Sequence, residues 1–499
     1  MQIYKEFLTA KNGSQIPVFL SGRTMESRYN PERDCQNLLD SISESGDFFL
    51  VLGAGSGIFI KLLSVKFPAA KIICLELYKE DLEFLSGLKT IAEMRANPNV
   101  IFSSLGEIEN TLIQNYLPAK YSTFKIIEQK GWVNENKDFI AQINSVLQKT
   151  LGIISADFSV QAHFGKIWNS NILNNSRLAE KCNSKELFES IKNHTDKTAV
   201  IVGAGPSLDK SLEIINKKNR SNYFVIATDT AGHALLKRNI QPDVIISIDA
   251  QSVSYNHFIN HKAEKNNTLY AFDLCSNWSA AKHICDSTDK VFFFTSGHPL
   301  AGAINITNRK ALPELFSGAG TVTITALDLA VQTGFTDILV LGADFSYSNG
   351  KAYTAGTYLD ALYNSTSSKL SESEKTFTKL MFRTELLPLP QDKKTTAILK
   401  AYRTSFENYL SSKKISFEKS DDIYKLHCSA GLCNSGETGR SSAFSLTTFM
   451  KKLSASDINE AETLLLPYVA WLRNSKDYKD LPYKDLLKLA LDSIVSYNK

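Results

Sequence analysis

The sequence predicts an α/β protein with two Rossmann-like domains in tandem and a helical C-terminal region. Two short apolar runs, Phe48–Leu52 and Ala199–Val202, lead directly into glycine-rich turns. A helical stretch and a further buried run follow each turn, and such units are typical of parallel sheets. Near the end of the chain, an apolar stripe that includes Leu486, Leu487 and Leu491 indicates a helix.

Composition limits both the class of protein and its partners. A chain of 499 residues exceeds one ordinary core and indicates two or three domains. With 43% hydrophobic and 22% charged residues, it resembles soluble globular proteins. The net charge of +4 gives no reason to expect a nucleic-acid partner. The seven scattered cysteines suit reduced thiols, the start has no signal-peptide pattern, and no apolar run approaches the roughly 18 residues of a membrane span. We therefore expect a cytoplasmic protein.

The first domain, residues 1–150, carries a glycine pattern typical of cofactor-binding folds. The strand Phe48–Leu52 enters Gly53-Ala54-Gly55-Ser56-Gly57, and Glu76 ends the next strand, Lys71–Glu76. An acid about 20 residues after such a turn is the usual partner of ribose hydroxyls. Taken alone, this pattern suggests a methyltransferase or a dinucleotide site. Residues 151–196 are expected to form a helical connector that contains the Asn-rich run Trp168–Ser176.

The central domain, residues 197–365, repeats the same theme, and residues 366–499 are expected to form a loop and helices. The composition of Ser365–Ser373 indicates a mobile loop. A helix is expected over Asp457–Arg473, with a kink at Pro467. The strands expected in the central domain after Ala199–Val202 are Phe224–Thr228, Val244–Ile248, Leu269–Phe272, Val291–Thr295 and Ile338–Leu341.

The turn Gly203-Ala204-Gly205-Pro206-Ser207 is the first candidate for a phosphate site. A buried strand precedes it, and Leu212–Ile215 indicates that a helix follows. Glycines let a ligand approach the backbone, and a helix N-terminus offers free N–H groups. Pro206 suits a first helical turn, and Ser207 can donate to a phosphate oxygen.

Acidic residues follow three of the expected strands. Asp229 comes after Phe224–Thr228, Asp249 after Val244–Ile248, and Asp344 shortly after Ile338–Leu341. Ligands of open parallel sheets bind outside the carboxyl ends of the strands, so we expect these acids to form a site. A second glycine-rich helix start, Gly318–Thr323, and the loop tyrosines Tyr347 and Tyr353 complete the set of candidates.

These residues resemble the central domain of Maf-type (motility-associated factor) flagellin glycosyltransferases. A similar pattern occurs in bacterial sialyltransferases and in archaeal 6-hydroxymethylpterin diphosphokinases. The likeness covers roughly residues 165–360, with a looser likeness over the whole chain. Its motifs are GAGPS at 203–207, Asp229-Thr230, Pro242-Asp243 with Ser247-Ile248-Asp249, and Gly342-Ala343-Asp344-Phe345 followed by Tyr353.

The resemblance implies a donor, an acceptor and a set of site residues. The donor would be a nonulosonic acid, such as pseudaminic acid, activated by cytidine monophosphate (CMP), and the acceptor a Ser or Thr hydroxyl of flagellin. No tightly bound cofactor is implied. The residues expected to bind the donor are Gly203, Gly205, Pro206, Ser207, Asp229, Thr230, Ser247, Gly320, Thr321, Thr323, Asp344 and Tyr347, and those expected to act in catalysis are Asp249, Tyr353 and Glu437.

The sequence departs from the sialyltransferase pattern at three kinds of position. Asp229 and Asp249 stand where sialyltransferases carry asparagines, and carboxylates beside a phosphate leave room for a divalent metal. The tyrosine spacing differs by one residue, which makes Tyr347 the weaker match. No histidine after Tyr353 matches the sialyltransferase base, so Asp249 and Glu437 are the candidates.

Other motifs receive structural interpretations. In the Maf-type context the Gly53–Gly57 turn is expected to be a relic fold that binds the acceptor or packs the domains. His298 is the best histidine candidate for the site, although a cap role is expected, and His427, Cys428 and Cys433 do not predict zinc. Two other functions stay open, namely a non-catalytic flagellar-assembly scaffold that binds a sugar nucleotide and a pterin diphosphokinase-like phosphotransferase.

Overall fold

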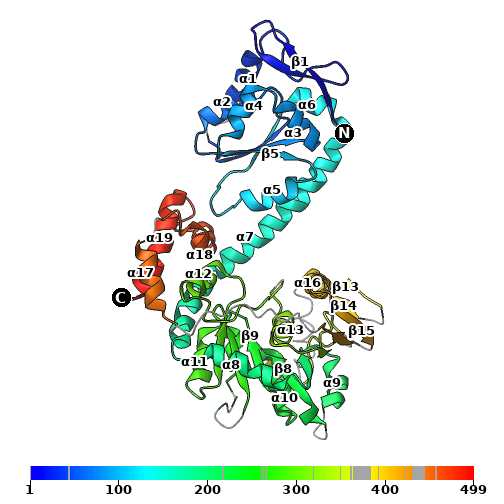
Figure 1. Cartoon of the computed structure of the whole chain (residues 1–499), viewed down its shortest axis with the longest axis vertical. Helices are drawn as coiled ribbons and strands as arrows, with labels where there is room; N and C mark the ends of the chain where they lie inside the picture. Colours follow the sequence, from blue (N-terminus) through cyan, green and yellow to red (C-terminus); the bar gives the residue numbers. More distant parts are fainter. Residues whose placement is uncertain are drawn as a thin grey trace, which may run out of the picture. The chain divides into compact units, whose positions relative to one another are not determined.

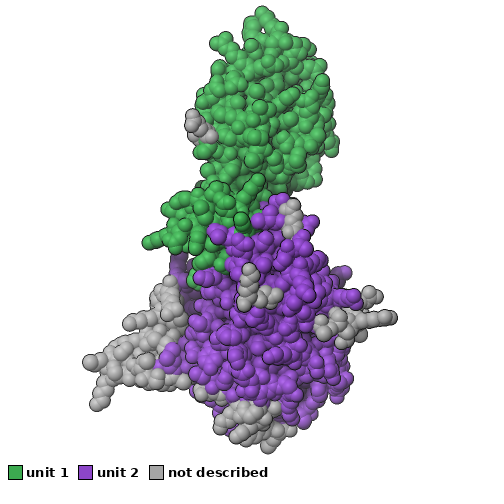
Figure 2. Space-filling model, turned by 90° about the vertical axis from the view of Figure 1, so that its left-hand side faces the viewer, with its two compact units in different colours: residues 1–165, 466–488 green, residues 166–465, 489–499 purple. Residues whose placement is uncertain are grey.

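The computed structural model describes residues 2–42, 45–215, 219–259, 261, 263, 267–318, 320–348, 350–359, 362, 384–390, 393–420, 422–429, 444–455 and 458–498 (Figure 1). The chain divides into two compact units (Figure 2). Unit 1 comprises residues 1–165 and 466–488, and unit 2 comprises residues 166–465 and 489–499. The predicted α/β class with parallel sheets and a helical C-terminal region is confirmed.

Unit 1 is built on a four-stranded parallel sheet with the order β5-β4-β3-β6. The predicted strands are β3 (Phe48–Leu52) and β4 (Lys71–Glu76), and every residue of β3 is buried. The other elements that begin in unit 1 before residue 165 are β1 (Tyr4–Thr9), β2 (Gln15–Phe19), α1 (Pro31–Asp40), α2 (Ile58–Lys66), α3 (Lys79–Leu85), α4 (Lys89–Arg95), β5 (Val100–Ser104), α5 (Ile108–Asn115), β6 (Lys125–Glu128), α6 (Lys130–Glu135) and α7 (Lys137–Ala179).

Unit 2 contains an eight-stranded sheet with the order β11-β10-β9-β8-β7-β12-β16-β15. The first six strands are parallel and correspond to the six expected ones: β7 (Thr198–Val202), β8 (Tyr223–Thr228), β9 (Val244–Ser247), β10 (Leu269–Asp273), β11 (Val291–Phe294) and β12 (Asp337–Leu341). The buried helix α13 (Val322–Thr333) packs against β7, β8 and β9. This core holds the carboxyl ends of six neighbouring strands at one edge.

Two antiparallel strands in the C-terminal region were not expected from the sequence. β16 (Ile423–His427) pairs with β12, and β15 (Ser416–Ser420) pairs with β16 at the edge of the sheet. β16 buries alternate residues, whereas every residue of β15 is exposed. A polar edge strand buries no face, so it carries no alternating apolar pattern to predict it.

The remaining elements are helical or very short. Helix α18 begins at Glu462 and contains Pro467, while the expected first residue, Asp457, lies outside the described residues, as does Ser365–Ser373. Within the described part of the chain, no helix is long and apolar enough to cross a membrane. These elements are α8 (Ser184–Ser190), η1 (Ile191–His194), α9 (Leu208–Ser211), η2 (Leu212–Ile215), η3 (Arg220–Asn222), α10 (Asp229–Lys237), η4 (Ser252–His257), α11 (Trp278–Cys285), α12 (Pro299–Thr307), β13 (Leu387–Pro388), β14 (Lys394–Thr395), α16 (Ala397–Ser412), α17 (Leu446–Ala455), α18 (Glu462–Asn474), α19 (Tyr483–Val495) and η6 (Ser496–Asn498).

Candidate functional site

The predicted acids of unit 2 gather at the carboxyl edge of its parallel strands. Asp229 begins α10 directly after β8, Asp249 lies just beyond β9, and Asp344 lies just beyond β12. A fourth acid, Asp273, is the last residue of β10 and is fully buried. Asp273 was not expected from the sequence, although it follows the apolar run Leu269–Phe272 in the same way that Asp249 follows its own strand.

The glycine-rich turn after β7 packs directly on the end of β12. The Gly205 N–H donates to the Gly342 carbonyl oxygen at 2.8 Å. A Cβ atom on Gly203 would lie 2.6 Å from that same oxygen, and one on Gly205 would lie 2.6 Å from Asp344 Cγ. Both glycines are therefore required by the packing of two neighbouring strand ends. Gly205→Val is therefore expected to disturb the packing of this turn on the end of β12.

The anion at this turn is a carboxylate of the chain itself. The Ser207 N–H donates to Asp344 Oδ2 at 2.8 Å, and the Ser207 hydroxyl donates to Asp344 Oδ1. Burial raises the pKa of Asp344, while the two bonds from Ser207 oppose that change. A phosphate that used Ser207 would have to displace Asp344 from it.

The helix that follows the turn is shorter than the sequence indicated. α9 covers only Leu208–Ser211, and the expected helical run Leu212–Ile215 forms the 3-10 helix η2. A single turn of helix aligns few peptide dipoles, so its N-terminus attracts an anion only weakly. Within this turn, the backbone N–H and hydroxyl of Ser207 thus contribute more to binding an anion than the helix dipole does.

Three predicted residues meet at the ends of β8 and β9. Asp229 Oδ2 accepts a hydrogen bond from the Ser247 hydroxyl at 2.6 Å, and Asp229 Oδ1 accepts one from the Thr230 N–H at 2.7 Å. The Thr230 hydroxyl lies 3.4 Å from His257 Nε2. The strand-end prediction therefore brings together Asp229, Thr230 and Ser247, and the structure adds His257 to them.

Asp249 and His257 form the titratable part of this cluster. Burial raises the pKa of Asp249, the nearby Asp229 carboxylate raises it further, and His257 opposes both effects. Burial lowers the pKa of His257, and the charges of Asp229 and Asp249 oppose this. The His257 ring also packs edge-on against Tyr358, with 4.5 Å between ring centroids. No pattern in the sequence predicts that His257, in η4, lies near these acids.

The segment after β12 returns to the glycine-rich turn and is held there. The Thr354 N–H donates to the Ala204 carbonyl oxygen at 2.9 Å. The neighbouring Tyr353 is 36% exposed, and the backbone bond of Thr354 brings this part of the chain to the 203–207 turn. The backbone of Tyr347 instead exchanges hydrogen bonds with Lys394 of β14. Glu437 lies outside the described residues.

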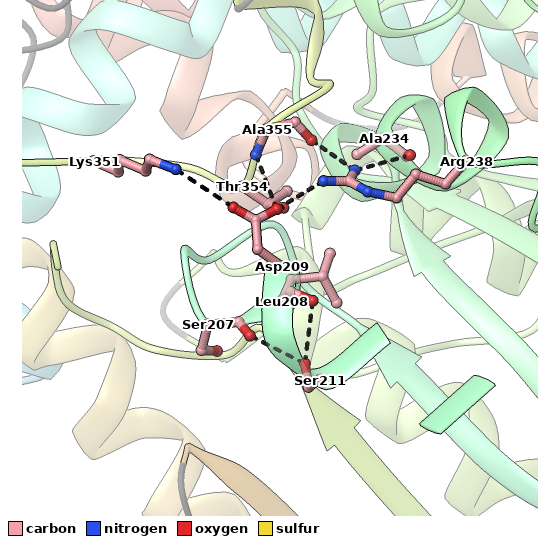
Figure 3. Close-up of polar contacts among 9 residues, drawn as sticks. All are labelled: Ser207, Leu208, Asp209, Ser211, Ala234, Arg238, Lys351, Thr354 and Ala355. Carbon is pink, nitrogen blue, oxygen red and sulfur yellow. Dashed lines mark hydrogen bonds and ion pairs between the residues drawn. The ribbon is translucent and has the colours of Figure 1, made fainter. Parts of the chain in front are cut away.

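Asp209 of α9 fixes this returning segment (Figure 3). Its Oδ1 atom accepts from the Thr354 hydroxyl at 2.6 Å, from Arg238 Nη2 at 2.7 Å and from the Ala355 N–H at 3.3 Å. Its Oδ2 atom lies 3.6 Å from Lys351 Nζ. We call Asp209, Arg238, Thr354 and Ala355 the Asp209 clamp. The clamp was not expected from the sequence because its members are far apart in the chain.

The second glycine-rich helix start lies close to the first. A Cβ atom on Gly203 would lie 3.5 Å from Thr323 Oγ1, and Thr321 and Thr323 are both buried. Gly320 has a φ of +87°, a left-handed conformation that favours glycine. An adjoining groove of about 830 Å³ is lined by Phe316, Leu387 and one face of α16. The Gly318–Thr323 loop is thus part of the same region as the 203–207 turn.

The structure assigns a capping role to His298 and shows no cluster of metal ligands among the described residues. His298 Nδ1 accepts a hydrogen bond from the Leu300 N–H at 3.2 Å and caps α12, so its expected cap role is confirmed. Among the described residues, no group of three or more His, Cys, Asp or Glu side chains could hold a metal ion.

The glycine-rich turn of unit 1 is filled by side chains of the chain itself. Glu76, fully buried, accepts hydrogen bonds from the Ala54 N–H at 2.6 Å, the Tyr4 hydroxyl at 3.0 Å and Trp132 Nε1 at 2.8 Å. Burial raises the pKa of Glu76 to about 7. The acid expected to bind ribose hydroxyls is therefore already surrounded by protein donors.

Side chains also fill the part of this turn that would face a phosphate in a nucleotide-binding domain. Glu26 Oε1 accepts from the Ser56 N–H at 2.7 Å. A Cβ atom on Gly55 would lie 1.7 Å from Met25 Cε, and one on Gly53 would lie 2.5 Å from Trp132 Cγ. Gly55→Val is therefore expected to disrupt unit 1. We call Met25, Glu26 and Trp132 the unit 1 plug.

Comparison with known families points to a class for the central part of the chain. A family model described as 6-hydroxymethylpterin diphosphokinase MptE-like matches residues 170–350. That range contains β7 to β12 and the acids at their ends. The resemblance to this class that the sequence motifs indicated is confirmed.

Individual proteins similar to this chain come from Treponema pallidum and Magnetospirillum magneticum. An uncharacterized protein of Treponema pallidum (strain Nichols) is 38% identical over 160 residues, which is 31% of this chain and 71% of the relative. The chain therefore belongs to the same family as that protein. A second uncharacterized protein of that strain is 34% identical over 142 residues, 27% of this chain and 49% of the relative. The solved MAf glycosyltransferase of Magnetospirillum magneticum AMB-1 is similar at 12% identity and a TM-score of 0.46, over 98% of this chain and 90% of that one.

Proposed function

We propose that unit 2 is a glycosyltransferase that moves a nonulosonic acid from its CMP-activated donor to Ser or Thr hydroxyls of flagellin. The observation that carries the proposal is the cluster of Asp229, Thr230, Ser247, Asp249 and His257 at the carboxyl ends of β8 and β9. Clefts at strand ends of this kind bind ligands in open parallel sheets. The Maf-type motifs in the same residues support the choice of donor and acceptor.

The chemistry asks for a base and for donors to a leaving phosphate. The bond between the sugar and the CMP oxygen breaks while the acceptor oxygen bonds to the sugar, and the acceptor proton passes to a base. His257 or Asp249 would take that proton, since each side chain feels the charge of the other. The hydroxyls of Ser207 and Tyr353 would donate to the CMP phosphate as its charge develops. Ser207 can do so only after it releases Asp344.

Transfer of a labelled sugar from its CMP donor to purified flagellin tests the proposal. We expect Asp249→Asn to lower the rate by roughly two to four orders of magnitude, which is typical for loss of a general base, and His257→Gln to identify which of the two groups takes the proton. Asp286→Asn is the matched control, because Asp286 is exposed on unit 2 and forms a surface ion pair with Lys282. Transfer that survives both Asp249→Asn and His257→Gln would remove this cluster from catalysis. Adding a chelator to each reaction tests for a divalent metal.

A second candidate function follows from the family match. The MptE-like match over residues 170–350 favours a phosphotransferase that acts on a pterin. Conversion of ATP and 6-hydroxymethylpterin to AMP and the pterin diphosphate would support it and contradict the glycosyltransferase. Binding of CMP-activated sugar without turnover of any donor would instead support a scaffold in flagellar assembly.

A further inference from the structure

A second pocket of unit 2 lies where the end of α7, α11 and the start of α17 meet, and it has a volume of about 360 Å³. This volume is near the lower end of the range of about 300–1,000 Å³ that is usual for ligand sites, so the pocket has room for a single substituted ring. None of the residues expected to bind the donor lines it. The described residues that line it most closely around its charged part are Arg177, Leu178, Glu180, Lys181, Trp278 and Lys282.

Helical spacing explains why these side chains share one pocket. Arg177, Leu178 and Lys181 follow one another at intervals of three and four residues, so they project from the same face of the chain at the end of α7. Trp278 and Lys282 are four residues apart in α11 and share a face in the same way. Two helix faces with cations and an aromatic ring therefore meet across the pocket.

Hydrogen bonds hold both of the other helices to α7. The Trp278 N–H, at the start of α11, donates to Asn171 Oδ1 of α7 at 3.3 Å. Glu180 Oε1 accepts from the N–H of Leu446, the first residue of α17, at 2.7 Å. The walls are thus in place before a ligand arrives, which lowers the entropic cost of binding.

The charge of the pocket is suited to an anion. Arg177, Lys181 and Lys282 bring three cations, and Glu180 is the acidic residue among the described lining residues. Lys282 pairs with Asp286 at 2.5 Å, but Lys181 is exposed and forms no ion pair with any described residue.

The guanidinium of Arg177 is held in position and still has donors to spare. Its Nη2 atom donates to the Tyr497 carbonyl oxygen at 2.9 Å, and its Cζ atom lies 4.5 Å from the centroid of the Tyr497 ring. The remaining N–H groups can donate to a carboxylate, which a planar guanidinium matches well. Together, Arg177 and Lys181 form an anion-binding side of the pocket.

Trp278 indicates that the anion carries a ring. Its half-buried indole offers a flat apolar face, on which the C–H groups of a sugar can pack. A nucleobase would in addition need hydrogen bonds to its edge. Among the described lining residues, Asn174 is the one side-chain amide, and it is engaged at both ends, because Nδ2 donates to the Ser170 carbonyl oxygen at 2.8 Å and Oδ1 accepts from the Tyr497 hydroxyl.

We propose that this pocket binds a sugar acid, with its carboxylate on Arg177 and Lys181 and its ring on Trp278. The binding site is separate from the strand-end cluster and does not depend on the reaction performed there. The nonulosonic acid of the proposed transfer is itself a sugar acid. If that proposal holds, the pocket would retain an acceptor through a sugar that it already carries.

Titration calorimetry of the full chain with N-acetylneuraminic acid, a nine-carbon sugar acid, tests the proposal. We expect saturable binding that weakens as salt is added, because the contact with Lys181 is exposed. Lys181→Gln should weaken binding about fivefold, as expected for an exposed ion pair. Lys425→Gln, at an exposed lysine of β16, is the matched control and should leave the affinity unchanged. N-acetylmannosamine, which lacks the carboxylate, should not bind.

Tryptophan fluorescence locates the bound sugar acid. We expect N-acetylneuraminic acid to change the fluorescence of the full chain in a saturable way and Trp278→Phe, which keeps an aromatic ring, to remove most of that change. Trp471→Phe, in unit 1, is the control and should preserve it.

Three outcomes would overturn the proposal. The first is no saturable binding of N-acetylneuraminic acid at millimolar concentrations, and the second is equal binding of N-acetylmannosamine. The third is binding that Lys181→Gln leaves unchanged but Asp249→Asn abolishes, which would place the sugar at the strand-end cluster instead. Binding of CMP that depends on Lys181 would likewise identify a nucleotide pocket. Because these titrations require no transfer, their failure is distinct from failure of the proposed glycosyltransferase reaction.

Discussion

Glu76→Gln should remove a pH-dependent part of the stability of unit 1. The folded state holds Glu76 with a pKa of about 7, against an ordinary value of 4.5, because the side chain is fully buried. The difference of about 2.5 corresponds to roughly 3 kcal/mol, at about 1.4 kcal/mol for each pH unit. Since the folded state binds the proton more tightly, this contribution is fully present below pH 4.5 and is lost as the pH rises through 7.

The substitution also has a cost that does not depend on pH. Two of the three donors to Glu76 can share the remaining amide oxygen, but the new NH₂ group faces the Trp132 Nε1–H. An unmatched buried donor costs about 1–3 kcal/mol. We therefore expect the variant to be less stable than the wild type at pH 5, and that deficit to shrink by roughly 2.5 kcal/mol by pH 8.

Urea unfolding read by hydrogen-exchange mass spectrometry on peptides from β3 and β4 isolates unit 1 from unit 2. Comparison of variant with wild type at each pH cancels the titration of the histidines, which both proteins share. Glu93→Gln is the control, because Glu93 is exposed and forms an ion pair with Lys61. A difference in unfolding free energy between wild type and Glu76→Gln that is the same at pH 5 and pH 8 would refute the reasoning.

Three further predictions concern cofactor binding at the unit 1 plug, the contribution of Trp132 to stability, and the Asp209 clamp. Neither S-adenosylmethionine nor NAD should shift the melting of the full chain, because Met25 and Glu26 occupy the turn that would bind them. A saturable shift in melting temperature with either cofactor would contradict this. Trp132→Ala should cost about 3–5 kcal/mol of unfolding free energy in unit 1, as buried aromatic truncations do, and a loss below 1 kcal/mol in urea titration would show that Trp132 is dispensable. Asp209→Asn should speed amide exchange in residues 351–356 by about tenfold, since it weakens several hydrogen bonds worth about 1 kcal/mol each; unchanged exchange would mean that other contacts hold the segment.

The strands were predictable from sequence wherever they are fully buried. β3 and β7 to β12 are short apolar runs between polar or glycine-rich segments, and burial on both faces of a parallel sheet requires such runs. The strand ends were predictable for the same reason, so Asp229 and Asp249 could be placed at one edge in advance. β15 could not be predicted, because an exposed edge strand is free to be polar.

Contacts between residues far apart in the chain could not be predicted from the sequence. Nothing near Asp209 indicates that it binds Thr354, which is 145 residues away. Likewise, nothing near Ser207 shows that its donors meet Asp344 rather than a ligand. The turn at Gly203 and Gly205 is predictable from the sequence, but nothing in the sequence shows that these glycines also leave room for the end of β12.

The unit 1 plug also explains why a glycine-rich turn can be retained for packing alone. Trp132 packs against Gly53, and Met25 packs against Gly55. Both contacts require the absence of a side chain at the glycine, as a bound pyrophosphate would. Glu26 Oε1 accepts the hydrogen bond that the Ser56 N–H would otherwise donate to a ligand. Mutations that add side chains at these positions would damage folding, so selection for folding alone can preserve the glycine spacing. Pattern searches that count only glycines would then assign cofactor-dependent chemistry to a turn that is packed with side chains of its own chain.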